Sequence, residues 1–391
     1  MPIVNRIAEY HDELTAWRRH LHERPELGFQ EHETAAFVAE KLRAVGCDEV
    51  HTGVGRTGVV AVVRGRGPGS TIGLRADMDA LPVQEATGAA WASRSPGRMH
   101  ACGHDGHTTM LLGAARYLAE TRNFAGTAYL FFQPAEEGGG GGREMVDDHL
   151  FERFPAERVF GLHNWPSTPL GTFAMCEGPA MAASDELTIE LIGTGCHAAW
   201  PHLGRDPIVA AALVIQSLQT LVAREVDPLD RAVISITRIQ GGDAYNVVPE
   251  RVELWGTIRT FRADTRERLI GRIREVVEGI AIAQGVQGKV RMAAGYPATI
   301  NAAPEAAIGA DVAAEIVGEG KVDRAPEPCM ASEDFAFMLH ERPGSYIWMG
   351  TGGTGPACRL HTPDYDFNDE ALPLGVSYWV RLVERLLPAA A

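Results

Sequence analysis

The segment Met99–His107 holds one thiol and three imidazoles within nine residues. Cys102 and His104 are ligand types that suit borderline transition metals such as zinc, cobalt, nickel and manganese. Burying His100 and His107 nearby without partners would cost free energy. The alternative is a packed Cys–His pair with no ligand role. Because the short spacing matches no zinc-finger pattern, we interpret the segment as part of an active-site metal centre.

Two adjacent carboxylates, Glu136 and Glu137, follow a predicted strand and precede five glycines. Adjacent carboxylates repel each other unless one of them meets a cation. In the functional interpretation, one carboxylate ligates a metal and the other takes a proton from an activated water. A solvated acidic turn is the alternative. The glycines form no phosphate-binding loop, because no Gly-Lys-Ser/Thr follows them.

His163 ends a predicted strand, and His361 lies in a Leu-His-Thr-Pro turn. Singly, each is more often a hydrogen-bonded histidine than a ligand. Both become plausible as further nitrogen donors of a site that already holds Cys102, His104 and Glu137.

Asp77 and Asp79 end another predicted strand. Because alternate residues of a strand face the same side, both could approach the site. Asp79 could orient a ligand histidine through a hydrogen bond. For Asp77, structural capping is an equal alternative.

The elements that must position these groups alternate between strand and helix. Predicted strands cover Thr71–Ala76, Thr127–Phe132 and Val159–Leu162, and a predicted helix covers Thr108–Leu118. This alternation predicts a three-layer α/β domain, in which strand ends commonly display active-site groups.

From about Asp185 the pattern changes to the order β-α-β-β-α-β, which is that of a ferredoxin-like α+β unit. We therefore expect residues 182–295 to form an inserted domain, and residues 1–181 and 296–391 to form the catalytic domain.

Composition narrows the class of protein. The 391 residues suit two domains, with a hydrophobic fraction of 45% and a charged fraction of 22%. A net charge of −15 argues against a nucleic acid or an anionic membrane surface as partner. No secretory signal is visible, and we expect no apolar run that approaches the roughly 20 residues of a membrane span. Six scattered cysteines make no disulfide framework, so we expect a cytoplasmic protein.

Taken together, the motifs resemble the M20 metallopeptidase and amidohydrolase family, in its aminoacylase, hippurate hydrolase and auxin-conjugate hydrolase branch. The resemblance runs nearly end to end. The matching stretches are Arg18–His22, Pro25–Gly28, Arg75–Pro82, Met99–His107, Gln133–Glu137, Gly161–His163, Gly195–Ala198, Asn246–Pro249, Ser332–Phe335 and Leu360–His361.

The resemblance implies two divalent metal ions per subunit (Mn, Zn, Co or Ni) and hydrolysis of N-acyl-L-amino acids, either hippurate-like or N-acetyl. It implies Cys102 as a bridging thiolate and Glu136 as the general base. The further implied metal ligands are His104, Glu137, His163 and His361.

The resemblance also implies a catalytic role for Asp79, whereas Asp77 stands where many M20 peptidases have a ligand histidine, which leaves its role in doubt. His197, Asn246 and Arg259 match residues of the inserted lid domain that contact the carbonyl or carboxylate of the substrate. A homodimer or dimer of dimers built on that domain is expected, with His197 reaching the neighbouring site. The alternatives are a dipeptidase or N-acetyl-diaminopimelate-type deacetylase on the same site, or a non-catalytic metal-binding scaffold.

Overall fold

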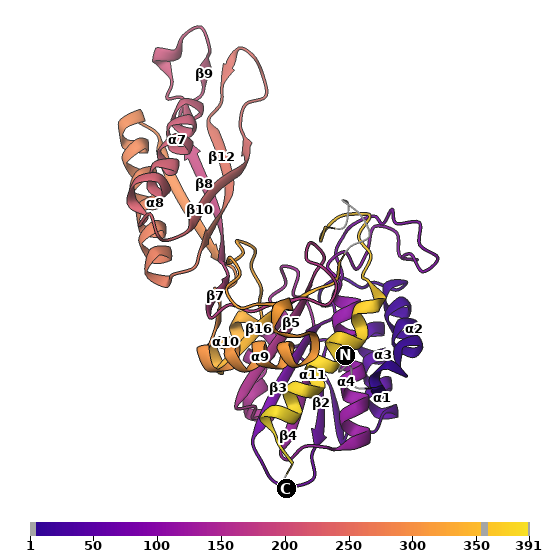
Figure 1. Ribbon diagram of the computed structural model, residues 1–391. Coiled ribbons are helices and arrows are strands. Elements are labelled where there is room, and N and C mark those ends of the chain that lie inside the picture. The colour runs from indigo at the N-terminus through magenta and orange to yellow at the C-terminus, as the bar shows by residue number, and fades with distance from the viewer. Residues whose placement is uncertain (1–4, 353–358, 390–391) are drawn as a thin grey trace. The chain divides into compact units, whose positions relative to one another are not determined.

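The computed structural model describes residues 5–352 and 359–389. The chain forms two compact units (Figure 1). Unit 1 combines Met1–Ala180, Thr299–Pro328 and Asp334–Ala391, and unit 2 combines Met181–Ala298 with Cys329–Glu333. The segment Cys329–Glu333, which the expected domain boundaries did not separate, belongs to unit 2 because the Ala182 N–H donates to the carbonyls of Cys329 and Ala331.

Unit 1 is built on an eight-stranded mixed sheet. Its centre is parallel, in the order β4 (Thr127–Gln133), β3 (Thr71–Asp77), β5 (Arg158–Trp165) and β16 (Gly344–Gly350). The flanking strands are β2 (Gly58–Arg64) and β1 (Glu49–Val54) beyond β4, and β6 (Phe173–Ala174) and β15 (Val322–Asp323) beyond β16. The short strands β7 (Gly178–Met181) and β14 (Thr299–Asn301) pair separately.

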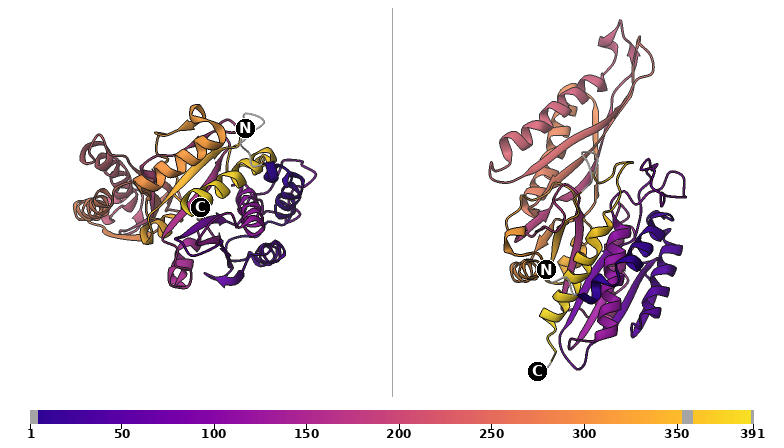
Figure 2. Two further views of the ribbon diagram at one scale, coloured as in Figure 1. Left: turned by 60° about the horizontal axis from the view of Figure 1, so that its bottom comes forward. Right: turned by 45° about the vertical axis from the view of Figure 1, so that its right-hand side comes forward.

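Helices cover both faces of this sheet. The side chains of β4 alternate between the two faces. Ala128, Leu130 and Phe132 pack in the main hydrophobic core, whereas Phe131 faces Phe151 on the opposite side. The core face carries α3 (His32–Ala44), α4 (His104–Thr121), α9 (Ala303–Val317) and α11 (Leu372–Leu386), with α1 (Asn5–Ala8) and α2 (His11–His22) packed outside them. The other face carries α5 (Gly141–Asp147), α6 (Leu150–Arg153) and α10 (Ala336–Glu341). Figure 2 shows α9 in orange beside α11 in yellow.

Unit 2 contains the elements in the order β-α-β-β-α-β. They are β8 (Ala183–Ile192), α7 (Pro207–Glu225), β10 (Ala232–Gln240), β12 (Arg251–Thr260), α8 (Ala263–Gln284) and β13 (Gln287–Ala294). The antiparallel sheet has the order β10-β12-β8-β13, which leaves β10 and β13 at its edges. Alternate residues of β8 (Leu187, Ile189 and Leu191) pack against the two helices. A separate two-stranded antiparallel sheet pairs β9 (Cys196–His197) with β11 (Val247–Val248). Short 3-10 turns lie at Pro201–Leu203, Glu319–Lys321 and Asp369–Ala371.

One described helix, α7, is long and apolar enough to cross a membrane by length and composition, with 19 residues and a mean hydropathy of 1.4. The sequence-based expectation of no such run was therefore wrong for this helix. Its inner side packs into the core of unit 2 through Ala210, Val214 and Leu218. A core helix passes the same test, so the helix alone is weak evidence for a membrane span.

Helix α4 begins at His104, four residues before the expected start at Thr108. Gly103 precedes it in the left-handed region with φ 91°. A side chain there would meet Asn164 Oδ1 at 2.4 Å, so glycine is required at this turn. As a result His104 and His107 occupy the first turn of a helix, three residues apart and on one face.

Candidate metal centre and active site

The candidate site lies where the parallel strands β3, β4 and β5 end. Asp77 is the last residue of β3, Glu136 and Glu137 follow β4, and His163 lies near the end of β5. The carboxyl ends of parallel strands meet at one edge of a sheet, which is where α/β proteins commonly bind ligands. Three segments that are remote in the sequence are thereby brought together.

His104 is completely buried and presents one free ring nitrogen. Its Nδ1–H donates to the Asp79 carbonyl at 2.9 Å, so the lone pair is on Nε2 when the ring is neutral. Nε2 has no hydrogen-bond partner among the described residues. Burial opposes a proton on His104, but the charge of Asp77 and the hydrogen bond to Asp79 outweigh it and raise its pKa to about 10. The surroundings therefore favour a positive charge at this ring, either a proton or a metal cation.

His163 and Cys102 face each other. The His163 Nδ1–H donates to the Asn164 carbonyl at 2.7 Å, which leaves the Nε2 lone pair 3.4 Å from Cys102 Sγ. Burial, followed by the charges of Glu137 and Glu136, raises the pKa of the Cys102 thiol. A cation at this position would offset both effects and stabilise the thiolate.

His361 and Glu137 make the second half of the cluster. His361 Nε2 lies 3.0 Å from Glu137 Oε1. This contact does not have hydrogen-bond geometry, so Glu137 Oε1 is left without a hydrogen-bond partner in the described part of the chain. The His361 N–H donates to the Ala101 carbonyl at 2.7 Å, which ties this exposed histidine to the segment that carries Cys102.

The donor atoms of these residues form overlapping triads, in each of which all atoms lie within 4.8 Å of one another. One triad is Cys102, His104 and His163, and another is Cys102, Glu137 and His361. Cys102 is common to both, as a thiolate shared between two ions would be. A buried set of thiol, imidazole and carboxylate donors, with His104 Nε2 and Glu137 Oε1 unpartnered among the described residues, fits divalent transition metals.

Asp79 holds two members of this cluster. Asp79 Oδ1 lies 3.2 Å from His104 Nδ1, and Asp79 Oδ2 accepts the Glu137 N–H at 2.9 Å. Both carboxylate oxygens are therefore used by neighbouring protein groups. A carboxylate beside Nδ1 of His104 is the usual arrangement for orienting a histidine whose Nε2 would bind a metal.

Asp77 contacts other protein groups closely. It accepts from Arg75 Nη1 at 2.7 Å and from His107 Nδ1 at 2.6 Å, and it lies 3.8 Å from His104 Nε2. His107 received no role from the sequence, although its place three residues after His104 on a helix would have put it here. The Asn164 N–H donates to His107 Nε2 at 3.0 Å, so both its nitrogens are engaged.

Glu136 is buried beside the cluster, with 7% of its surface exposed. A carboxylate oxygen of Glu136 lies within 4.8 Å of donor atoms of His104 and Glu137. The adjacent carboxylates are thus presented to the same small region, which suits one ligand and one proton acceptor.

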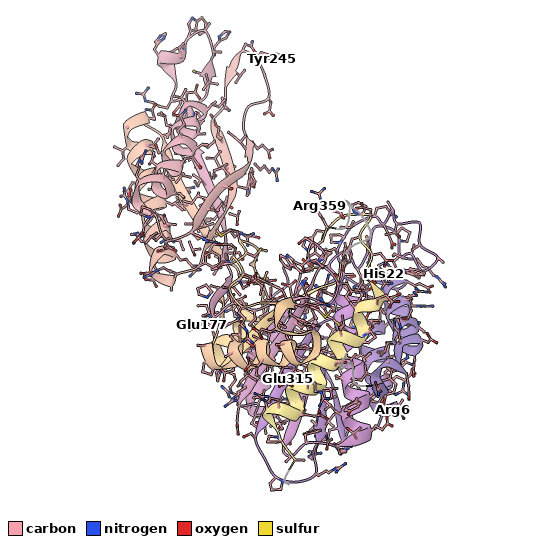
Figure 3. All side chains as sticks on the ribbon, in the orientation of Figure 1. Arg6, His22, Glu177, Tyr245, Glu315 and Arg359 are labelled. Carbon is pink, nitrogen blue, oxygen red and sulfur yellow. The ribbon has the colours of Figure 1, made fainter. Side chains whose placement is uncertain are left out.

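The three unit 2 residues predicted from the sequence lie in two places. His197 and Asn246 are neighbours at the two-stranded sheet of β9 and β11, where the Asn246 carbonyl accepts the Ala198 N–H at 2.9 Å. They line a hollow of about 490 Å³. Tyr245 projects into solvent at the same tip (Figure 3).

Arg259 lies near the other end of β12, where its Nη1 donates to Ser332 Oγ at 2.9 Å. The paired strands β9 and β11 adjoin Glu250 and Arg251, and eight residues of extended strand from Arg251 to Arg259 span roughly 26 Å. Asn246 and Arg259 therefore lie near opposite ends of β12 within one copy of unit 2.

The hydrogen bonding of the exposed His197 ring shows which of its nitrogens carries the proton. The Ala199 N–H donates to His197 Nδ1 at 3.0 Å, so the ring proton is on Nε2. An exposed imidazole N–H is suited to donating to a carbonyl oxygen.

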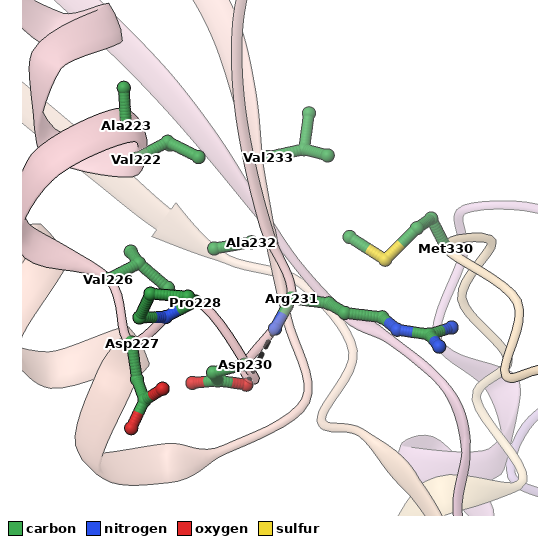
Figure 4. A pocket seen from close by; sticks show the side chains of 10 residues that line it. All are labelled: Val222, Ala223, Val226, Asp227, Pro228, Asp230, Arg231, Ala232, Val233 and Met330. Carbon is green, nitrogen blue, oxygen red and sulfur yellow. Dashed lines mark hydrogen bonds between the residues drawn. The ribbon is translucent and has the colours of Figure 1, made fainter.

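A second hollow of unit 2, of about 400 Å³, lies beside the end of α7 (Figure 4). Its walls include Val222, Val226 and Met330, and the Arg231 N–H donates to Asp230 Oδ1 at 2.8 Å at its rim. It contains none of the metal-ligand residues predicted from the sequence.

Residues 73–385 match the peptidase family M20/M25/M40. The chain belongs to this family. The match covers most of unit 1 and all of unit 2, so both parts of the M20 chain are included.

Relatives of known activity match this M20 chain over nearly its full length. It is 41% identical over 387 residues to a hippurate hydrolase of Campylobacter jejuni, and the alignment covers 99% of this chain and 100% of the relative. It is 38% identical over 374 residues to an N-acetylcysteine deacetylase of Bacillus subtilis, with 95% and 96% covered. A crystal structure of a dinuclear metal-binding M20 peptidase from Bacillus subtilis superposes with a TM-score of 0.85 at 36% identity, covering 98% of this chain and 100% of the other. This M20 protein is a metal-binding hydrolase.

Proposed function

We propose that this protein hydrolyses the amide bond of N-acyl-L-amino acids, hippurate-like or N-acetyl, to a carboxylic acid and a free amino acid. The observation that carries the proposal is the convergence of the Cys102 thiol with the unpartnered donor atoms of His104 and Glu137, beside the buried Glu136. The likeness to a hippurate hydrolase and an N-acetylcysteine deacetylase supports this substrate class.

Cys102, His104, Glu137, His163 and His361 would hold two divalent ions, which we propose to be Mn, Zn, Co or Ni. When bound, such ions polarise a carbonyl group and lower the pKa of a water molecule. Backbone carbonyls accept the Nδ1 protons of His104 and His163, so that in both rings the Nε2 lone pair would be the metal ligand.

Glu136 would act as the general base. It accepts a proton from the attacking water and passes it to the nitrogen of the leaving amino acid, so that the amide bond breaks with a neutral amine. General acid–base catalysis of this kind contributes about 10²–10⁴-fold in rate.

Unit 2 would serve as a lid and a dimerisation domain. Its sheet has unpaired edges at β10 and β13, and α7 exposes Ile208, Val209 and Leu213 to solvent. Edge strands and exposed apolar side chains are commonly covered by a partner. A two-fold dimer formed by this unit would cover both.

His197 and Asn246 would then complete the site of the neighbouring subunit. The separation of the β9–β11 sheet from Arg259 along β12 supports this arrangement. One small substrate would not contact both Asn246 and Arg259 in one copy of unit 2. In the dimer, His197 Nε2–H would donate to the carbonyl oxygen as negative charge develops on it. Arg259 would bind the carboxylate of the amino acid.

Mixing His197→Ala subunits with Glu136→Ala subunits tests the trans arrangement. Each parent is expected to be inactive. A mixed dimer would contain one intact site and one site that lacks both groups, so each mixed dimer should have about half of wild-type activity. After random exchange of a 1:1 mixture, in which about half of the dimers are mixed, about a quarter of wild-type activity should return. No recovery, despite subunit exchange shown by tagged subunits, would exclude the cross-subunit role.

A substrate panel tests the function itself. Metal-loaded protein is assayed on N-benzoyl-glycine, N-acetyl amino acids, N-acetyl-diaminopimelate and dipeptides. The proposal expects the highest kcat/KM on an N-acyl amino acid. Highest kcat/KM on a dipeptide or on the diaminopimelate derivative would favour those alternatives, and no turnover with full metal occupancy would indicate a non-catalytic scaffold. We further infer a cytoplasmic protein without nucleic-acid or membrane partners, consistent with its net charge of −15.

A further inference from the structure

Glu31 lies behind the turn that presents the two active-site glutamates. It is completely buried in the loop before α3. One oxygen, Oε1, accepts the Ala135 N–H at 2.8 Å, and the other, Oε2, accepts the Thr57 hydroxyl at 2.6 Å. Glu31 therefore connects β2, through the adjoining Thr57, to the residue that immediately precedes Glu136.

The turn that Glu31 holds has a backbone conformation that most residues avoid. Ala135 has φ 49°, in the left-handed region. A non-glycine residue there is strained, because its Cβ lies too close to the following carbonyl oxygen. Its N–H is the first one after Pro134, which has none, and a buried N–H without a partner would cost free energy as well. The Glu31 carboxylate supplies that partner.

The same turn is held from its other side by Asp79. Asp79 Oδ2 accepts the Glu137 N–H, two residues after the N–H that Glu31 accepts. Glu136 therefore lies between two peptide groups, each anchored by a buried carboxylate. This explains how adjacent glutamates can keep different orientations and take different roles.

Close packing restricts the turn further. A Cβ at Gly28 would lie 3.0 Å from Ala135 Cβ and 3.1 Å from Ala135 Cα. The loop that contains Gly28 also runs beside the strand end of Asp79, where the Ala80 N–H donates to the Glu26 carbonyl at 2.8 Å. One short segment, residues 26–31, thus contains the first anchor of the turn, Glu31, and contacts Ala80, which follows the second anchor, Asp79.

We propose that Glu31 is a positioning residue, which fixes the Ala135 turn so that Glu136 and Glu137 meet their separate tasks as base and ligand. The proposal rests on the proposed function. It gives a role to the Pro25–Gly28 region, which the sequence singled out without assigning it one.

The main test compares Glu31→Ala with Glu31→Gln on an N-acyl amino acid at saturating metal. Glu31→Ala is expected to lower kcat about 10-fold or more, to change KM less than about 3-fold and to weaken metal binding measured by titration. In Glu31→Gln, the amide oxygen can accept the Ala135 N–H while the NH₂ group donates to Thr57, so kcat should stay within about 3-fold of wild type. Rescue by glutamine separates positioning from loss of a charge.

A matched control is Glu305→Ala, which removes a buried carboxylate on α9 that pairs only distantly, at 3.5 Å, with Arg158. It should keep the wild-type kcat and metal affinity even if it unfolds at lower temperature. Equal kcat in Glu31→Ala and Glu305→Ala would overturn the proposal.

Gly28→Ala and Thr57→Ala keep the proposal testable if Glu31→Ala does not fold. Gly28→Ala places a methyl group against Ala135, and Thr57→Ala removes one of the two hydrogen bonds to the Glu31 carboxylate. Each should lower kcat with little change in KM, and wild-type kcat in both would overturn the proposal. If the wild-type protein itself hydrolyses no N-acyl amino acid, the proposed function fails, and titrated metal affinity of the same variants still decides whether Glu31 positions Glu137.

Discussion

Asp79 accepts the Nδ1–H of His104 through its own backbone carbonyl, at 2.9 Å, and its carboxylate lies 3.2 Å from the same nitrogen. A single residue thereby fixes the tautomer and the direction of a ring that we propose to be a metal ligand. The second carboxylate oxygen accepts the Glu137 N–H, so one side chain contacts two of the proposed ligands.

Removing this side chain should weaken metal binding without removing a ligand. We expect Asp79→Ala to lower metal affinity about 10–100-fold, the range for groups that orient ligands. Asp79→Asn keeps an acceptor for only one of the two N–H groups, so its affinity should lie between those of alanine and wild type. Isothermal titration with Zn²⁺ or Mn²⁺ measures both, and an unchanged affinity in Asp79→Ala would show that the carboxylate has no such role.

Glu136→Ala should separate chemistry from metal binding. Turnover is expected to fall about 10²–10⁴-fold, the contribution of a general base, while metal content stays near the wild-type value. Metal analysis and single-turnover rates on the same preparation check this. Loss of metal, or wild-type turnover, would mean that the tasks of Glu136 and Glu137 are assigned wrongly.

Cys102 should make the enzyme sensitive to oxidation. As a ligand it must be a thiolate, so peroxide in the absence of reductant should release metal and abolish activity together. Cys47→Ala is the matched control, because it removes a thiol far along the chain and should leave this sensitivity unchanged. A Cys102→Ala protein that binds two ions with wild-type affinity would show that the thiol is not a needed ligand.

His22 predicts how stability depends on pH. Burial lowers its pKa, but hydrogen bonds to Asp105 and Glu85 outweigh burial and raise the pKa to about 9. Because the folded pKa exceeds the unfolded value of about 6.5, the stabilisation is complete below about pH 6.5 and is lost as the pH rises through about 9.

The loss should be on the order of 1–3 kcal/mol for wild type relative to His22→Gln. Urea unfolding at about pH 7 and about pH 10 measures it as the difference between the two proteins. The same pH dependence in both would rule out a contribution from His22.

Much of the site followed from residue types and strand ends. Cys102, His104, Glu137 and His163 come together because parallel strands end at one edge of the sheet and because thiol, imidazole and carboxylate share a preference for transition metals. His361 could be proposed only beside the other donors, since a lone histidine in a turn carries little signal.

Other features could not be derived from local patterns. The role of Glu31 depends on contacts with Thr57 and Ala135, which lie 26 and 104 residues away. The early start of α4 depends on Gly103, whose left-handed backbone conformation is not visible in hydrophobic periodicity. The distance between Asn246 and Arg259 follows from the continuous strand β12, which begins at Arg251 and contains Arg259 near its other end.

The most direct test of metal-dependent amide hydrolysis at this site combines metal analysis with an assay on N-benzoyl-glycine. Purified protein is analysed for bound metal, stripped with a chelator and reloaded with Mn²⁺ or Zn²⁺, and glycine release is followed at each stage. The predicted result is two ions per chain, loss of glycine release on stripping and its return on reloading. Glycine release that survives complete removal of metal, or two bound ions with no turnover of any N-acyl amino acid, would contradict the account.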